Sequence, residues 1–223
     1  PVLAATSPTD CFEAAFEASK MALEHMTPVV LLTDAFVANG SAAWKLPKLA
    51  DYPAIQPPFV PAELKGTWTP YQRNEEGVRY WAIPGTEGFT HILGGLEKDN
   101  ATGAISTNPE NHHLMTQLRQ QKIDNIKVPD VVVEGDKDDA ELLIVGFGGT
   151  YGHLHAAMDD MRAAGKKVAL AHFKYINPLP KNTEEVLKKY PKVVVAEQNM
   201  GQFAGYLRMK IDGFVPNQYN EVK

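Results

Sequence analysis

Cysteine and long apolar runs are nearly missing from this sequence of 223 residues. Its one thiol, Cys11, cannot form an internal disulfide, and it cannot alone supply the cysteine set that holds an iron–sulfur cluster. A chain without disulfides suits a reducing compartment, so we predict a cytoplasmic location. No apolar run approaches the roughly 20 residues that span a bilayer, so we predict no membrane association.

Excess positive charge is also missing, because the net charge at pH 7 is −5. The one long concentration of lysines, residues 181–192, is interleaved with Glu184 and Glu185 and is interpreted as a solvated helix face. A nucleic-acid-binding surface needs clustered lysine and arginine. We therefore predict no nucleic-acid partner.

Motifs of the common hydrolases and metalloproteins do not occur. The sequence contains no Gly-x-Ser-x-Gly elbow, no P-loop, no His-Glu-x-x-His motif and no pair of cysteines. His112 and His113 are neighbours on a predicted helix and point about 100° apart, so they cannot bind one ion together. We therefore predict neither a catalytic residue nor a metal site in this chain.

The first 40 residues have the pattern of an α/β domain that is entered in its middle. Val2–Ala5 follow Pro1 at once, without an initiator methionine, so we expect a fragment or a processed piece. Residues 7–10, Ser-Pro-Thr-Asp, predict the start of a helix, and Val29–Leu32 predicts a buried parallel strand. Asp34 follows this strand, where it either faces a ligand or caps the next turn.

Residues 41–90 contain seven of the sixteen prolines. Proline excludes both helix and central strand, while aromatic residues such as Trp68 and Trp81 argue against a floppy linker. We interpret the segment as an extended arm that its aromatic rings anchor, either on its own domain or on a partner subunit. Asn108-Pro109-Glu110 then predicts a helix that ends before Pro129.

Residues 139–223 alternate strands and helices. Strands are predicted at residues 142–145, 168–171 and 193–196, and a helix follows each of them. Buried strands that alternate with helices indicate a parallel sheet that is covered on both faces. The acidic segment of residues 134–139 is interpreted as a solvated hinge, and we place a domain boundary there.

A glycine turn with Gly146, Gly148 and Gly149 follows the first of these strands. Tyr151 stands where the dinucleotide-binding fingerprint needs its last glycine, and no acidic residue follows the second strand, so we expect no nicotinamide cofactor. Two interpretations of the turn stay open. Either it binds no ligand, or its glycines approach a phosphate or carboxylate, with Lys174 as the nearby cation.

The third strand ends in a polar cluster that contains Glu197, Asn199 and Gln202, just before a predicted helix. The end of a buried parallel strand is where a ligand site or a subunit contact is usually built. The alternative is that Asn199 caps the helix and Glu197 is paired locally.

The order of several motifs resembles one family. The motifs are Ser7–Ala14, Thr27–Asp34, Tyr71–Arg73, Ala82–Gly88, Gly94–Glu97 and the tail Leu142–Lys210. Together they resemble the α subunits of 2-oxoacid:ferredoxin oxidoreductases. The 2-oxoglutarate type is the most similar, and the 2-oxoisovalerate and pyruvate types stay open.

The resemblance implies an α/β fold in three parts. Residues 1–40 would be the end of a pyrimidine-type thiamine diphosphate-binding domain. Residues 41–138 would be the proline- and aromatic-rich connecting arm with its helix. Residues 139–223 would be a transketolase-C-terminal-like domain, in which three layers are built around a parallel sheet.

The resemblance also implies an activity, the oxidative decarboxylation of a 2-oxoacid with CoA and the reduction of ferredoxin. Thiamine diphosphate, Mg²⁺ and a [4Fe-4S] cluster serve the whole enzyme, but this chain has no motif that binds them. The chain would therefore be inactive alone, and its partners would be the β subunit, ferredoxin, CoA and the 2-oxoacid. A non-catalytic interaction module is the alternative.

The same resemblance suggests roles for single residues. Gly146, Gly148, Gly149 and Lys174 would approach CoA or the substrate. A subunit junction or the substrate channel would be lined by the polar cluster and the arm tryptophans, namely Glu197, Asn199, Gln202, Trp68 and Trp81.

Overall fold

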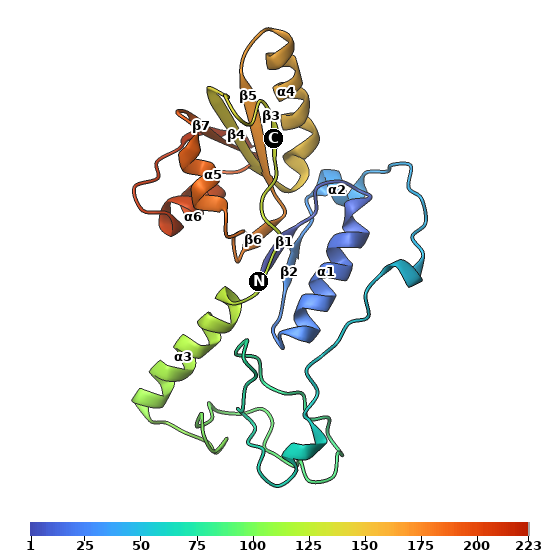
Figure 1. Cartoon of the computed structure of the whole chain (residues 1–223), viewed down its shortest axis with the longest axis vertical. Helices are drawn as coiled ribbons and strands as arrows, with labels where there is room; N and C mark the ends of the chain where they lie inside the picture. The colour runs from blue at the N-terminus through green and yellow to red at the C-terminus, as the bar shows by residue number, and fades with distance from the viewer. Residues whose placement is uncertain (223) are drawn as a thin grey trace. The chain divides into compact units, whose positions relative to one another are not determined.

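The computed structural model describes residues 1–222, and the chain divides into two compact units (Figure 1). The first, here called the sheet unit, contains residues 2–16, residues 30–45 and the chain from Val128 onward. The second, here called the arm unit, contains Pro1, residues 17–29 and residues 46–127. Helix α1 begins in the sheet unit and ends in the arm unit.

A five-stranded sheet is the centre of the sheet unit. Its strand order is β3-β5-β4-β7-β8, and every neighbouring pair is parallel except β3 and β5. The strands are β3 (Val133–Gly135), β5 (Val168–Phe173), β4 (Leu142–Phe147), β7 (Val193–Glu197) and β8 (Asn217–Asn220). The three predicted strands are thus confirmed as the middle of a mostly parallel sheet.

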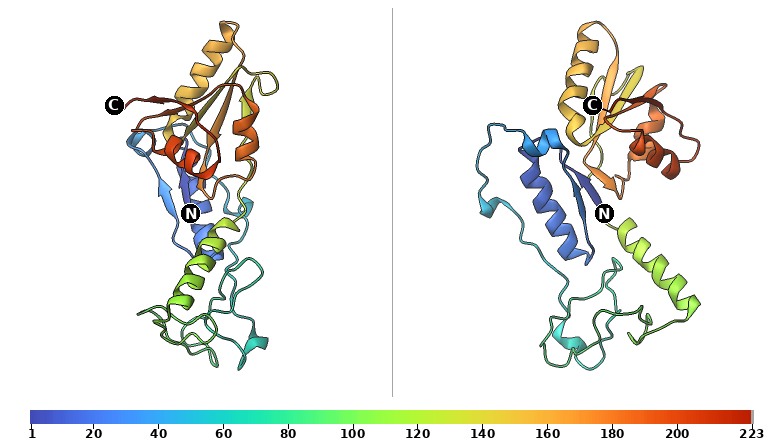
Figure 2. Two further views of the ribbon diagram at one scale, coloured as in Figure 1. Left: turned by 90° about the vertical axis from the view of Figure 1, so that its left-hand side faces the viewer. Right: turned by 180° about the vertical axis from the view of Figure 1, so that it is seen from behind.

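Helices cover both faces of this sheet (Figure 2). Helix α4 (Tyr151–Ala163) covers one face, where Met158 packs with Ile144 and Leu170. On the other face α5 (Thr183–Lys189) and α6 (Gln202–Lys210) bury apolar side chains in the larger core. Burial of these aliphatic and aromatic side chains is the main force that joins the layers. The predicted three-layer α/β architecture is therefore confirmed.

A second, three-stranded sheet is formed by β1 (Val2–Ala4), β2 (Val30–Leu32) and β6 (Tyr175–Asn177), in the order β2-β1-β6. Helix α1 (Asp10–Glu24) and the short α2 (Ala35–Asn39) accompany it (Figure 1). A small core of Ala5, Ala14 and Val37 lies here, and Cys11 and Leu31 pack against it.

The prediction for β2 is half right. The strand is parallel to β1, as expected, but it is not buried, because Val30 is 53% exposed and Leu32 is 39% exposed. The physical reason is its position: β2 is the edge of its sheet and pairs only with β1. An apolar run alone does not distinguish an edge strand from a central one.

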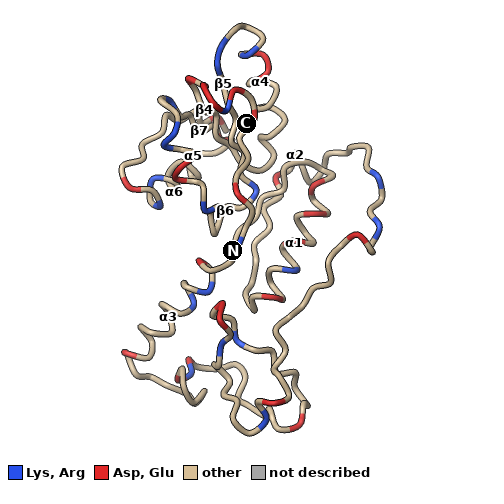
Figure 3. Tube along the Cα trace, viewed as in Figure 1, with Lys and Arg blue, Asp and Glu red and all other residues tan. Residues whose placement is uncertain are grey.

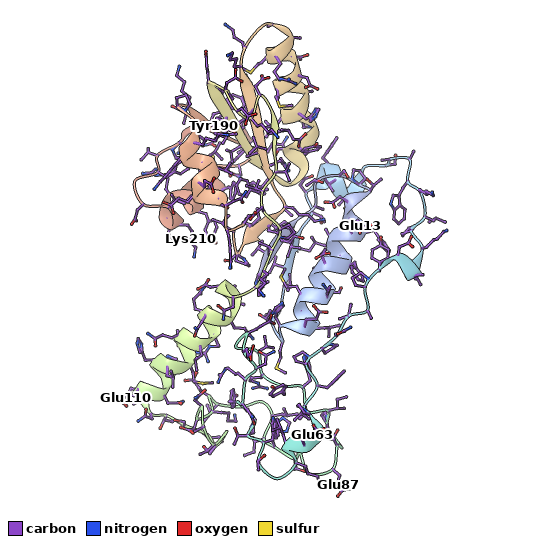
Figure 4. All side chains as sticks on the ribbon, viewed as in Figure 1. Glu13, Glu63, Glu87, Glu110, Tyr190 and Lys210 are labelled. Atoms are coloured by element: carbon purple, nitrogen blue, oxygen red, sulfur yellow. The ribbon has the colours of Figure 1, made fainter. Side chains whose placement is uncertain are left out.

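The acidic segment before β4 is bonded into the sheet unit. Strand β3 pairs with β5, and the Asp136 carboxylate accepts hydrogen bonds from the Arg162 side chain and, at 3.1 Å, from Val168 N. The Tyr190 hydroxyl, labelled in Figure 4, donates to Lys137 O at 2.7 Å. The last stretch of the sheet unit thus begins at Val128, whereas the division at residues 40 and 138 stays a prediction.

The arm unit has little regular structure but has a core of its own. Its elements are η1 (Leu49–Asp51), η2 (Ala62–Leu64) and helix α3 (Pro109–Asp124). The predicted start of α3 is confirmed, since Asn108 Oδ1 accepts a hydrogen bond from Asn111 N at 2.7 Å. Buried apolar side chains form the core, namely Met21, Val78, Phe89, Met115 and Ile126. The proline- and aromatic-rich segment is therefore folded rather than disordered.

Gly135 provides a test of the packing between β3 and β5. Its φ is +81°, and a Cβ placed there would lie 2.6 Å from Val168 O and 2.7 Å from Met158 Sδ. We expect Gly135→Ala to lower the free energy of unfolding by about 2–4 kcal/mol, because left-handed strain and overpacking add. Gly165 is the matched control, since its φ is +77° but a Cβ would meet no atom within 4 Å.

For Gly165→Ala we expect a loss of about 1 kcal/mol, from the backbone conformation alone. Urea unfolding followed by circular dichroism measures both variants. Equal losses in the two variants would contradict the close approach of β5 and α4 to Gly135.

Candidate functional site

The carboxyl ends of β4 and β7 are neighbours in the sheet, and most of the predicted site residues lie in these strand ends or follow them. The turn Gly148–Thr150 follows β4, and the segment from Gln198 follows β7. Together with α2 they line a cavity of about 410 Å³. Its lining includes Ala4, Leu32, Asp34, Phe36, Gly149 and Asn199.

Asp34 occupies the glycine turn with its carboxylate. One oxygen, Oδ2, accepts a hydrogen bond from Gly149 N at 3.0 Å, and Oδ1 accepts one from Val37 N at 2.9 Å. A Cβ at Gly149 would lie only 2.0 Å from Oδ2, so a glycine is required there. The capping interpretation of Asp34 is thereby confirmed, and its carboxylate also binds the N–H group of the glycine turn, whereas a ligand at Asp34 stays a prediction.

The other two glycines of the turn have different surroundings. A Cβ at Gly146 would lie 2.2 Å from Leu154 Cδ1, so this glycine lets helix α4 pack closely on β4. Gly148 lines the cavity next to Ala4, and a Cβ there would be 3.7 Å from the Ala4 Cβ. An approach of these glycines to CoA or substrate stays a prediction.

The polar cluster after β7 holds the start of helix α6. Glu197 is buried, and its two carboxylate oxygens accept hydrogen bonds from Phe203 N at 2.8 Å and Ala204 N at 2.9 Å. Asn199 Oδ1 accepts from Gly201 N at 2.7 Å and from Gln202 N at 3.2 Å. The capping interpretation therefore describes Glu197 and Asn199, whereas the side chain of Gln202 is exposed.

Lys174 is an anion partner, but its partner here is Asp10 of the same chain. Lys174 Nζ lies 2.8 Å from Asp10 Oδ1, while Asp10 Oδ2 accepts from Thr6 N at 2.9 Å. Ser7 Oγ accepts from Asp10 N at 3.1 Å, as expected for the start of α1. Lys174 lines a separate cavity of about 220 Å³ beside His172 and Tyr151, so the structure does not bring it to the glycine turn.

The two tryptophans both lie in the arm unit. Trp81 Nε1 donates to Leu23 O at 2.9 Å, which ties the arm to the end of α1. Trp68 packs edge-on against Phe89 and His91, with ring centroids 5.6 Å and 5.0 Å away. Both rings are half-buried in their own unit, and their contact with a partner subunit stays a prediction.

His172, at the end of β5, was not assigned a role from the sequence. Burial lowers the pKa of its imidazole from 6.5 to about 4, against the opposing effects of a hydrogen bond involving Phe147 and the charge of Asp10. The ring contacts Tyr151 edge-on at 5.1 Å. Because its pKa is lowered, the histidine is neutral at physiological pH. The one signal in the sequence that could have found it was its position at the end of a buried strand.

A further cavity, in the arm unit, was missed entirely. It has a volume of about 380 Å³, and its lining side chains include Arg73, Arg79, Lys98, Arg119 and Lys122. These residues are spread over about 50 positions and follow no periodic pattern. Only the tertiary structure brings them together, so a motif search could not find them.

Within residues 1–222 no three His, Cys, Asp or Glu side chains are grouped closely enough to hold a metal ion. No helix in the described part of the chain is both long and apolar enough to cross a bilayer.

Comparison with protein families and curated proteins gives a consistent picture. Residues 140–223 match the family model "Pyruvate:ferredoxin oxidoreductase core domain II". The chain is 49% identical over 211 residues to the 2-oxoglutarate oxidoreductase subunit KorA of Mycobacterium tuberculosis, covering 94% of this chain and 32% of that protein. It is 28% identical to subunit alpha of 2-oxoacid:ferredoxin oxidoreductase 1 of Aeropyrum pernix, over 98% of this chain and 35% of that protein.

A solved structure matches the whole chain. The 2-oxoglutarate:ferredoxin oxidoreductase of Magnetococcus marinus, with 2-oxoglutarate, coenzyme A and succinyl-CoA bound, superposes with a TM-score of 0.89 and 28% identity. The match covers 100% of this chain and 39% of that one. The chain thus spans about a third of the length of the curated relatives named above.

The contact between Asp34 and Gly149 predicts a non-additive pair of substitutions. Gly149→Ala should lower the free energy of unfolding by about 2–3 kcal/mol, because the methyl group displaces the carboxylate and breaks its hydrogen bond. In an Asp34→Ala background the same change should cost less than about 1 kcal/mol. Urea unfolding of the four proteins of this cycle measures the coupling, and additive losses would contradict the contact.

His172 predicts a dependence of stability on pH. The unfolded imidazole binds a proton near pH 6.5, while the folded one does so only near pH 4, so the unfolded state holds more protons between these values. Stability from the neutral ring is therefore complete above pH 6.5 and is lost as the pH falls to about 4. Between pH 7 and pH 4.5 the wild type should lose about 2 kcal/mol more than His172→Gln.

The measurement is urea unfolding at several pH values. His113→Gln, at an exposed position of α3, is the control, and its free energy of unfolding should fall with pH as that of the wild type does. A parallel curve for His172→Gln as well would mean that His172 is not buried as a neutral ring.

Proposed function

Because the chain belongs to the family of 2-oxoacid:ferredoxin oxidoreductase α subunits, we propose that it is part of an enzyme that oxidises 2-oxoglutarate. The observation that carries the proposal is the superposition of all of its described fold on an oxidoreductase with bound 2-oxoglutarate and CoA. Identity of 49% to a 2-oxoglutarate oxidoreductase subunit supports this substrate.

The reaction converts 2-oxoglutarate and CoA to succinyl-CoA and carbon dioxide. The bond between C1 and C2 of the oxoacid breaks, C1 leaves as carbon dioxide, and C2 becomes bonded to the CoA sulfur. The thiol proton is released, and two electrons reduce two molecules of oxidised ferredoxin, one electron each. Thiamine diphosphate supplies the carbanion chemistry in such enzymes, and an iron–sulfur cluster accepts the electrons singly.

These cofactors do not fit the donor atoms of this chain. It has one cysteine, and residues 1–222 contain no group of ligands for a metal ion. We therefore assign thiamine diphosphate, Mg²⁺ and the [4Fe-4S] cluster to the rest of the enzyme, the β subunit included. The part described here then supplies structure and binding surface rather than the reacting atoms, and it is inactive alone.

Within that role, Gln202, Trp68 and Trp81 are proposed as contacts with the β subunit. The exposed side chain of Gln202 is not used as a helix cap, in contrast to Glu197 and Asn199. The cavity beside Asp34 and Gly149 is the proposed approach for CoA or substrate. The glycines of the turn have no side chains, so a ligand could pack closely against the backbone there. The carboxylate of Asp34 repels an anion at Gly149 itself.

The test is CoA-dependent reduction of a viologen dye by the complete α subunit with its β partner. We expect reduction with 2-oxoglutarate to exceed that with pyruvate or 2-oxoisovalerate by at least about tenfold, a difference of about 1.4 kcal/mol in transition-state stabilisation. The control is the 223-residue chain alone, which should give none. Faster turnover of pyruvate or 2-oxoisovalerate would overturn the substrate, and no turnover by the cofactor-loaded complex would overturn the function.

A further inference from the structure

The cavity of the arm unit is lined by an excess of positive charge. Five cationic side chains and one carboxylate face this cavity of about 380 Å³, here called the cation cavity. They come from three segments: residues 71–79, the loop 94–98 and helix α3. Figure 3 shows lysine and arginine on α3 and on the loops of this unit. The charged lining residues are Arg73, Arg79, Glu97, Lys98, Arg119 and Lys122.

The charges in this cavity are not balanced. Glu97 is the one carboxylate of the lining, and it is already used by Arg119 at 2.7 Å and by His112 at 2.6 Å. No carboxylate within residues 1–222 forms an ion pair with the other four cations. Burial, followed by the neighbouring cations, lowers the pKa of Lys122 and of Arg73. Like charges are therefore held together without a counter-charge.

Neutral groups hold these cations in place. Lys122 Nζ donates to Met26 O at 2.7 Å. The buried Lys98 donates to Gly94 O at 2.6 Å and to Leu96 O. Carbonyl oxygens orient an ammonium group but do not cancel its charge, so the site is preorganised for an anion.

The arginines are oriented in the same way. Arg73 donates to Tyr71 O at 2.9 Å and to the Asn100 side chain. Arg79 lies over the Tyr71 ring at 4.4 Å, and its Nε is buried without a hydrogen-bond partner in the described structure. A buried donor without an acceptor is costly and rare in folded proteins, which indicates a ligand that is not part of the chain.

We propose that the cation cavity binds the phosphate groups of CoA, an inference that rests on the proposed function. Arginine forks and lysine ammonium groups match phosphate oxygens. A phosphomonoester alone carries a charge of about −1.5 to −2 at pH 7, and CoA adds a diphosphate to it, so its total charge corresponds to four unpaired cations. A dicarboxylate such as 2-oxoglutarate has fewer charges and would leave part of the cavity unfilled.

The test is isothermal titration of the complete α/β complex with CoA, 3′-dephospho-CoA, inorganic pyrophosphate and 2-oxoglutarate. For Arg79→Gln we expect the Kd for CoA to rise about tenfold or more, because the change removes charge-assisted hydrogen bonds to phosphate. For Arg119→Gln, whose guanidinium group is shared with Glu97, we expect a smaller rise in the same direction. The Kd for pyrophosphate should rise similarly, and the Kd for 2-oxoglutarate should stay the same. Arg119 is exposed on α3, so its replacement does not endanger folding.

Lys65→Gln is the matched control. Lys65 belongs to the same unit, does not line the cavity and pairs with Glu87 at 2.9 Å, both side chains being exposed. Figure 4 labels Glu87 in a loop of the arm unit, at the bottom of the view. This variant removes one positive charge without touching the cavity, so its Kd for CoA should equal that of the wild type.

Each outcome has one meaning. Unchanged CoA affinity in both arginine variants would overturn the proposal. A loss of affinity for 2-oxoglutarate alone would also overturn it, and would assign the cavity to the oxoacid. An equal loss of CoA affinity in Lys65→Gln would mean that the effect comes from net charge and not from the cavity, and would overturn the proposal. Weaker binding of CoA but not of 3′-dephospho-CoA would place the phosphomonoester in the cavity. Failure of the proposed function is a separate result, because it is read from dye reduction by the wild-type complex.

Discussion

The shared carboxylate of Asp34 is the interaction on which the architecture of the sheet unit depends. Its two oxygens accept hydrogen bonds from Val37 N and Gly149 N, so one side chain joins the start of α2 to the turn before α4. Because the chain continues from β2 into Asp34, this contact fixes the small sheet against the carboxyl edge of the large one. It defines the wall of the cavity there and explains why Gly149 can have no side chain.

A second contact between the two sheets reinforces the first. Ala4 N donates to Lys174 O at 2.8 Å, β1 pairs with β6, and Lys174 binds Asp10 at the start of α1. Each of these contacts is made by a partly buried charged group or by a backbone group. Hydrogen bonds of these groups are strong when both partners are satisfied. These contacts help to hold the two sheets in one unit.

The long regular elements could be predicted from the sequence, whereas several of the short ones could not. Buried runs such as Leu142–Val145 identify central strands, because both of their faces are covered. Strands β6 and β8 are short, and the polar residues of β8 carry no hydrophobic pattern, since all of them are exposed. Their pairing depends on neighbours that are distant in the chain, which local propensity does not record.

For the candidate site, the sequence predicted where the polar residues lie better than it predicted what their side chains bind. Glu197 and Asn199 were found from their position after a strand, but their oxygens bond the N–H groups of α6. The cation cavity escaped attention because Arg73 and Lys122 are far apart in the chain and only folding makes them neighbours.

The small core beside Asp34 also has a consequence for chemical labelling. Burial raises the pKa of the Cys11 thiol, and the charges of Asp10 and Asp34 raise it further. Because the thiolate is the form that reacts with maleimides and disulfide reagents, the only sulfhydryl group of this chain is slow to react while the fold is intact. Opening of the small core exposes Cys11 and removes it from the Asp34 carboxylate, so the rate of alkylation becomes a built-in reporter of local opening.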